Sequence, residues 1–410
     1  MGSVVPTRWR SRIVLMVVAT TLVLSTLSLG IAAAGSARAN PTFGPVSVSR
    51  IDSFDLRSPA AKSVPVGDGP EGVTFDSANR YVYVADAGSD NVSVINGTTN
   101  TVVGSIRVGS LPDGVGFDRS NRYVYADNAG SNNVSVINGA TDTVIGSIPV
   151  GSGPRVVAFD SVNQNVYVTN HLSNNVTVID GMTDRVSGSV PVGSLPDGIA
   201  FDGSNHYLYV ADEGSNNVTV ISGTTDTVVG SVPVGSAPRL VAFDSSNGYV
   251  YVANTGSNNV TVINGKTDTV VGSIAVGHFP QGVTFDSSNR YVYVTDRDSD
   301  QVTVINGTTD TVIASVGVEK YPDGIAFDSS NRDVYVANHD SNSVSVINGK
   351  TDKVIASVLV SGIPSGVLLN ISSHGAISGL SGATTGAPRG SPISSDPVAV
   401  KAPFSPERKP

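Results

Sequence analysis

The sequence predicts an all-β protein, a seven-bladed β-propeller built from four-stranded antiparallel blades. Two observations lead to this fold. The pair Phe-Asp returns seven times at intervals of 42 residues, and each interval holds four short apolar segments separated by Gly, Asn and Asp, which mark turns. A repeat of about 40–45 residues with several short strands is typical of propeller blades. The phenylalanines that set this period are Phe75, Phe117, Phe159, Phe201, Phe243, Phe285 and Phe327.

Residues 1–39 are predicted to be a signal peptide. Three arginines precede an uncharged apolar run over residues 13–34, and Ala37-Arg38-Ala39 resembles a cleavage site. The run of 22 residues is also long enough to span a bilayer, so an uncleaved membrane anchor is the alternative. Both interpretations place the remainder outside the cytoplasm, secreted or at the cell surface. Residues 40–59 are expected to form a linker.

Within the second repeat, strands a to d are expected at residues 115–118, 123–127, 134–138 and 144–150. Strand b of the first repeat, residues 81–84, is apolar at every position, which indicates that neighbouring blades cover both of its faces. Strand d carries a recurring proline, which cannot donate to a central ladder, so it belongs at the rim. These prolines are Pro149, Pro191 and Pro233.

The residue before each repeat phenylalanine is small. Because the sheets converge near the ring axis, we expect each bulky ring to face a small side chain of a neighbouring blade. The small residues are Thr74, Gly116, Ala158, Ala200, Ala242, Thr284 and Ala326.

The repeats extend over residues 60–369. Residues 61–66 resemble an unattached strand d that could complete the last blade, but residues 354–360 offer that blade a strand of its own, and the sequence leaves the choice open. Residues 370–410 are rich in Ser, Gly and Pro and are predicted to be a disordered tail.

Several segments carry a family resemblance. VYVAD, VYVTN, VYVAN and SNNVTVING resemble the YVTN-type β-propeller repeat of archaeal surface-layer proteins and related exported bacterial proteins. The resemblance implies a propeller displayed at the cell envelope as a structural, adhesive or protein-interaction module. We therefore expect a non-enzymatic protein with a protein or glycan partner.

Charge and composition narrow the partners further. The formal charge of −9 becomes −13 when the four arginines of residues 1–39, which contain no acids, are removed. So acidic a surface disfavours nucleic acid, and membrane contact is expected only through an uncleaved N-terminal segment. The chain has no cysteine, and hence no disulfide or thiolate ligand. No cofactor is expected, apart from calcium as considered below.

The loops between strands d and a are expected to gather around the channel mouth. The residue after the proline of each such loop would form a charged ring that either binds a cation or consists of mutually paired side chains. This ring comprises Glu71, Asp113, Arg155, Asp197, Arg239, Gln281 and Asp323.

A binding patch is predicted between blades six and seven. There the usual SLP, SGP or SAP loops become HFP and KYP, and exposed aromatic residues amid charge are typical anchors of recognition surfaces. The patch comprises His278, Phe279, Lys320, Tyr321, Asp296, Arg297, Asp298, Asp300, His339 and Asp340.

The run DRDSD places Asp296, Asp298 and Asp300 at alternate positions, as in the first half of a calcium loop, although the glycine and the distal glutamate are missing. A solvated turn is the alternative.

The sequence also contains sequons for asparagine-linked glycosylation. A turn followed by a β-branched residue would produce the same pattern without glycosylation. These asparagines are Asn91, Asn96, Asn133, Asn175, Asn217, Asn259, Asn306 and Asn370.

Two other functions stay open at this stage. One is a lyase or lactonase-like enzyme with a metal-dependent site at the channel mouth, for which His278, His339 and Glu71 are the candidates. The other is an extracytoplasmic protein that binds a small ligand or a metal in the channel. Recognised catalytic motifs such as GxSxG and HExxH are missing from the sequence.

Overall fold

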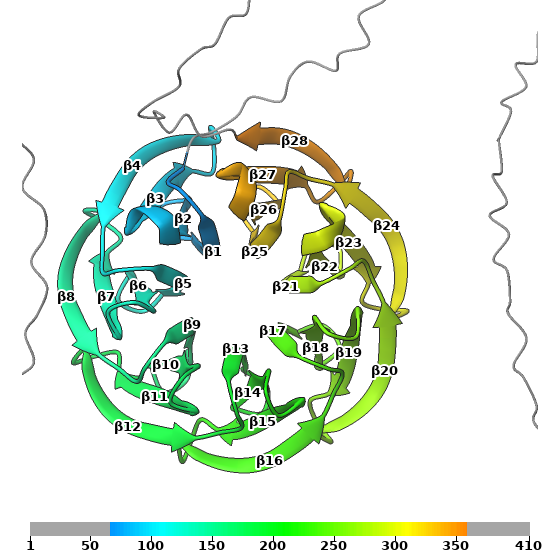
Figure 1. Cartoon of the computed structure of the whole chain (residues 1–410), viewed down its shortest axis with the longest axis horizontal. Coiled ribbons are helices and arrows are strands. Elements are labelled where there is room, and N and C mark those ends of the chain that lie inside the picture. The colour runs from blue at the N-terminus through cyan, green and yellow to red at the C-terminus, as the bar shows by residue number, and fades with distance from the viewer. Residues whose placement is uncertain (1–65, 359–410) are drawn as a thin grey trace, which may run out of the picture. The chain divides into compact units, whose positions relative to one another are not determined.

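The computed structural model describes residues 66–358, which form a ring of seven four-stranded sheets around a central channel (Figure 1). Each sheet consists of four strands that follow one another in the chain and pair in sequence order, antiparallel throughout. The predicted seven-bladed propeller is therefore confirmed.

The strands of equal position in the seven blades have nearly equal lengths. The innermost strands, a, are β1 (Pro70–Asp76), β5 (Pro112–Asp118), β9 (Pro154–Phe159), β13 (Pro196–Asp202), β17 (Pro238–Asp244), β21 (Pro280–Asp286) and β25 (Pro322–Asp328). The b strands are β2 (Tyr81–Asp86), β6 (Tyr123–Asn128), β10 (Asn165–Asn170), β14 (Tyr207–Asp212), β18 (Tyr249–Asn254), β22 (Tyr291–Asp296) and β26 (Asp333–Asn338).

The outer half of each blade repeats in the same way. The c strands are β3 (Asn91–Asn96), β7 (Asn133–Asn138), β11 (Asn175–Asp180), β15 (Asn217–Ser222), β19 (Asn259–Asn264), β23 (Gln301–Asn306) and β27 (Ser343–Asn348). The d strands, at the rim, are β4 (Thr101–Arg107), β8 (Thr143–Pro149), β12 (Arg185–Pro191), β16 (Thr227–Pro233), β20 (Thr269–Ala275), β24 (Thr311–Gly317) and β28 (Lys353–Val358). Short 3-10 turns follow strand b in three blades: η1 (Ala87–Ser89), η2 (Arg297–Ser299) and η3 (His339–Ser341).

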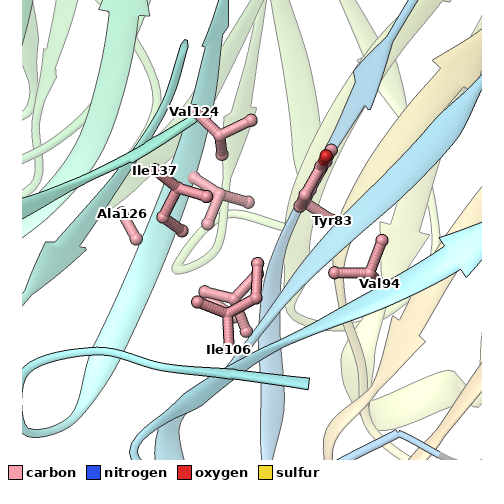
Figure 2. Packing of buried hydrophobic residues seen from close by; sticks show 9 residues of the cluster. Tyr83, Val94, Ile106, Val124, Ala126 and Ile137 are labelled. Atoms are coloured by element: carbon pink, nitrogen blue, oxygen red, sulfur yellow. The ribbon is translucent and has the colours of Figure 1, made fainter. Parts of the chain in front are cut away.

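Strand b packs against both neighbouring blades, as its sequence predicts. On one face, Tyr83 and Ala85 share a buried cluster with Val124 and Ala126 of the second blade (Figure 2). On the other face, Val82 lies in the cluster that joins the first blade to the last. Side chains such as Tyr83 are fully buried, so the apolar interfaces between blades form the core of the molecule.

The predicted match of large and small residues near the axis is also present. Ala158 and Phe201, from successive blades, contact the same buried cluster, and Ala200 and Phe243 repeat this arrangement one blade further on. The small side chain leaves room for the neighbouring ring where the sheets converge.

A hydrogen bond to the turn between strands c and d joins each blade to the next. The buried tyrosine of strand b donates its hydroxyl proton to a side-chain oxygen in the turn between strands c and d of the following blade, at 2.6–2.8 Å. We call this contact the tyrosine latch. The seven latches are Tyr83–Asp142, Tyr125–Asp184, Tyr167–Asp226, Tyr209–Asp268, Tyr251–Asp310, Tyr293–Asp352 and Tyr335–Asn100.

The ring closes by contact between complete blades. β28 gives the last blade an outer strand from its own repeat, and β26 and β1 are in contact across the closure. Val66 is buried in the cluster that joins these two blades, and the amide of Gly69 donates to Asn342 at 2.8 Å. The remaining candidate strand, residues 61–65, lies outside the described residues, as do the predicted signal, linker and tail. Among residues 66–358, no helix is long and apolar enough to cross a membrane.

Candidate functional site at the channel mouth

A bulge in strand a places one side chain of each blade at the channel mouth. The pairing of strands a and b shifts register between the proline and the third residue after it, for example between Pro70 and Val73. Such a bulge redirects the side chain that follows the proline. All seven predicted ring residues consequently line one cavity, of only about 40 Å³, together with glycines such as Gly72 and Gly324. We call this set the mouth ring. Because the cavity has room for only a few waters, a substrate must sit on the ring rather than inside it.

Two arginines of the mouth ring are paired with acids. Arg155 Nη1 donates to Asp113 Oδ2 at 2.6 Å. Arg239 contacts Asp197 Oδ2 through Nε at 3.0 Å and Nη2 at 2.9 Å, and its Nη1 reaches Gln281 Oε1 at 2.8 Å. The alternative of mutual pairing therefore describes this part of the ring correctly.

The mouth ring as a whole has more acids than arginines. Burial, with the nearby carboxylates of Asp323 and Asp113, raises the pKa of Glu71 to about 10. Burial also raises the pKa of Asp113 to about 6 against the opposing charge of Arg155. Burial opposes ionisation of Asp197 too, but Arg239 and Arg155 lower its pKa. Glu71 is therefore protonated at neutral pH, whereas Asp197 is ionised.

A histidine from the loop after strand b stands beside Glu71. His339 Nε2 lies 3.4 Å from Glu71 Oε1, and His339 Nδ1 lies 2.8 Å from Asp340 Oδ1. When Nδ1–H donates to Asp340, Nε2 is left with a lone pair directed at the glutamic acid. The candidates His339 and Glu71 are thus brought together, whereas His278 lines a separate hollow.

The loop after strand b contributes a second tier above the mouth ring. Each of its residues immediately follows strand b, and several of them reach over the next blade, as when Thr255 Oγ1 donates to the carbonyl of Pro280 at 2.7 Å. Sequence reasoning missed this tier as a group, although its members share the 42-residue spacing. They are Ala87, Ala129, His171, Glu213, Thr255, Arg297 and His339.

A second omission is Asp127, which lies on strand b where the other blades carry Ala or Thr. It is fully buried, and neither carboxyl oxygen makes a well-formed hydrogen bond within the described part of the chain. Burial, with Asp113 nearby, raises its pKa well above the usual range. The signal was available in the sequence, because Asp breaks the apolar pattern of the b strands.

The predicted patch between blades six and seven is only partly assembled. Arg297 lies between two aromatic rings, 5.7 Å from the centroid of Phe279 and 4.9 Å from that of Tyr321. His278, Phe279 and Asp298 line a hollow of about 470 Å³. Lys320 is exposed, and its amide donates to Ser341 Oγ at 2.8 Å. His339 and Asp340, by contrast, belong to the channel mouth.

The alternating aspartates do not converge. Asp296 is fully buried and accepts from Thr303 at 2.6 Å and Gln301 at 3.1 Å, whereas Asp298 is exposed. Asp300 accepts the amide of Tyr321 at 3.0 Å. Their spacing follows from the end of strand b and the 3-10 turn after it, so this calcium candidate is not assembled.

The strand-c asparagines among the predicted glycosylation positions have structural partners. Asn133 Nδ2 donates to Ser147 Oγ at 3.1 Å, and Asn259 Nδ2 donates to Ser273 Oγ at 2.9 Å, joining strands c and d. Asn370 lies outside the described residues. Glycosylation stays a prediction.

The far end of the channel holds a wider cavity, of about 470 Å³. Its walls include Phe75, Phe117 and Phe327, with Arg119 and serines of the a–b turns. Acid–base groups with shifted pKa values are concentrated instead at the mouth ring, which makes the mouth the candidate site.

Comparison with known proteins supports the fold and changes the expected function. A family model described as "Lactonase, 7-bladed beta-propeller" matches residues 109–275, which is less than half of the chain. Hydrazine synthase of Kuenenia stuttgartiensis is similar in structure, with a TM-score of 0.63 and 20% identity over 72% of this chain and 99% of that one. At this identity the likeness shows the fold alone. No curated protein matches.

The match to the lactonase model overturns the expectation of a non-enzymatic protein. That expectation depended on the YVTN resemblance and on missing linear motifs, but propeller sites are assembled from separate blades and leave no such motif. The propeller implied by the resemblance is confirmed. The YVTN-type family, export and a surface-layer role stay predictions.

Proposed function

We propose that the protein is an enzyme that hydrolyses small lactones or related esters at the channel mouth. The observation that carries this proposal is the contact of Glu71, an acid that keeps its proton at neutral pH, with His339, which Asp340 orients. The lactonase model that matches residues 109–275 supports the same reaction class.

An acid and a base side by side supply the two proton transfers of ester hydrolysis. His339 Nε2 takes a proton from a water molecule as its oxygen attacks the lactone carbonyl. The ring C–O bond then breaks, and the leaving oxygen takes the proton of Glu71, giving a hydroxy acid. Transfer of the proton from His339 to Glu71, across 3.4 Å, restores both groups.

The arginines of the mouth ring suit an anionic substrate. Arg155 keeps a third of its side chain exposed, whereas Arg239 is held on both sides by Asp197 and Gln281. A guanidinium can bind a substrate carboxylate or stabilise the oxyanion that forms at the carbonyl. We therefore expect small lactones that carry a carboxylate or phosphate to be preferred to neutral ones.

The test is hydrolysis of a panel of charged and neutral lactones by the purified chain. Glu71→Gln and His339→Ala should each lower kcat by about 100-fold or more, as loss of a general acid or base does. Both changes introduce a residue that another blade carries at the same position, Gln281 and Ala87 respectively, so folding should be retained.

The matched control is His206→Arg, a change on the opposite face to the residue that several other blades carry at that position, such as Arg80. It should leave kcat unchanged. Hydrolysis unaffected by His339→Ala, or no hydrolysis of any lactone by the wild-type chain, would refute the assignment.

The aromatic patch supports a second candidate function, recognition of an envelope glycan or protein. Tyr321 keeps 38% of its surface exposed although Arg297 stacks on its ring. His278 and Asp298 offer hydrogen-bonding groups in the hollow that Phe279 lines. Phe279→Leu and Tyr321→Leu introduce the residue of the equivalent loops at Leu111 and Leu195, which share the same positive φ. Both variants should lose binding on a glycan array, whereas Leu111→Ala should not. Equal binding by all would remove this candidate.

Export stays a prediction from the signal and fits either function. A signal-bearing chain expressed in its own host should appear outside the cytoplasm, beginning near Asn40 if the signal is cleaved. N-terminal sequencing of the isolated protein distinguishes cleavage from an uncleaved anchor.

A further inference from the structure

The third and fourth blades carry a group of metal-ligand side chains that the proposed acid–base pair does not use. One ligand atom each of His171, Asp197 and Glu213 lies within 4.8 Å of the other two. We propose that these residues bind a divalent transition ion, with zinc as the best fit. The site is separate from the proposed acid–base pair and does not depend on it.

A contact of Nδ1 with a backbone carbonyl orients His171 for metal binding through Nε2. His171 Nδ1 lies 3.3 Å from the carbonyl oxygen of Pro196. When Nδ1 carries the proton and donates to this carbonyl, the lone pair of Nε2 is free for a ligand bond. A hydrogen bond from the other ring nitrogen to a backbone carbonyl is the usual support of metal-binding histidines.

The two carboxylates can also bind a cation, because they are charged and have oxygens available. Arg239 forms an ion pair with Asp197 at 2.9 Å, which favours the carboxylate form that binds a cation. Arg239 bonds only its Oδ2, through two nitrogens, which fixes the carboxylate and leaves Oδ1 available. Glu213, half-buried, adds a second negative charge from the second tier.

The three groups face one another without direct contact. Within the described part of the chain, no ion pair joins His171 to Asp197 or Glu213. Arg239 balances the charge of Asp197, but Glu213 adds a second carboxylate and His171 can add an acceptor nitrogen, which together favour a bound cation. One imidazole nitrogen and two carboxylate oxygens form a three-ligand zinc set that leaves a position open for water.

An internal comparison separates this group from an ordinary loop histidine. His339 occupies the same position between the last blade and the first, but there it pairs with Asp340 at 2.8 Å, and the third position holds Ala87. The residue after His171 is Leu172, which offers no such partner. The same fold position therefore supports an acid–base pair in one place and a metal site in the other.

The experiment is calorimetric titration of the chelator-treated full chain with Zn²⁺, followed by Mn²⁺ and Ca²⁺, in the absence of substrate. One Zn²⁺ should bind per chain and raise the melting temperature. His171→Ala and Glu213→Thr should each weaken zinc binding by more than about tenfold, since even loss of a group that only orients a ligand has an effect of this size. The two substitutions introduce residues that other blades carry at these positions, Ala129 and Thr255.

His339→Ala is the control and should bind zinc as the wild type does, although the proposed hydrolysis would be lost. No zinc binding by the wild type, or equal binding by His171→Ala, would overturn the metal site. Because zinc binding is measured without a substrate, neither result bears on the proposed acid–base pair, which the lactone assay tests separately.

Discussion

Two of the tyrosine latches differ mainly in their acceptor, so the strengths of two interblade hydrogen bonds can be compared. Tyr167 donates to Asp226 Oδ1 at 2.6 Å, whereas Tyr335, at the ring closure, donates to Asn100 Oδ1 at 2.7 Å. Both rings are fully buried. Replacing either tyrosine with phenylalanine removes the hydroxyl and leaves the packing of the ring unchanged.

The two latches differ in the charge of the acceptor. A hydrogen bond to a charged group contributes about 1.5–3 kcal/mol, and a neutral one about 0.5–1.5 kcal/mol. Asp226 is partly exposed and can be resolvated once the hydroxyl is gone, which favours the lower end of its range. We therefore expect Tyr167→Phe to lower the free energy of unfolding by about 2 kcal/mol and Tyr335→Phe by about 1 kcal/mol.

The assay is urea denaturation of the wild type and both variants at pH 7, with equal m-values as the condition for comparison. The latches are far apart in the ring, so the double variant should show the sum of the two losses. An equal or larger loss at Tyr335 would refute the argument from acceptor charge and assign the difference to ring closure.

Two further predictions concern acids whose pKa the fold raises. A raised pKa means that the stability present below the unfolded-state pKa is lost as the pH rises toward the folded-state value. Asp127→Ala, which introduces the residue of the equivalent positions Ala85 and Ala211, should therefore raise the melting temperature at pH 8 and change it much less at pH 4; equal gains at both would contradict a buried, neutral acid. Glu71→Gln should be more stable than the wild type by an amount that grows between pH 5 and pH 10, since the folded-state pKa is about 10. A constant difference measured by thermal unfolding across this range would count against the raised pKa.

The mouth ring illustrates how far sequence reasoning reaches into the candidate site. Its seven members could be named in advance because each follows a proline at a fixed position in an equal repeat, and the bulge in strand a then directs them all to one cavity. Their pairing could not be named. Whether Arg155 bonds Asp113 or Asp197 depends on side-chain directions that no repeat pattern encodes.

The second tier shows more clearly which contacts could not be predicted from the sequence. Glu71 and His339 are 268 positions apart in the sequence and meet only because the last blade closes on the first. His171 and Glu213 belong to successive blades, and their approach depends on how one loop leans over the next. Sequence reasoning could not predict this approach and did not include His171 or Glu213 among the candidates.

By itself the sequence determined the number of blades, the order of the strands and the apolar face of each, because spacing and hydrophobic pattern are local properties repeated seven times. Only the tertiary structure decided which polar groups share a site and which acids keep their protons. Those properties depend on distances and burial across blade interfaces, and closure of the ring creates these interfaces.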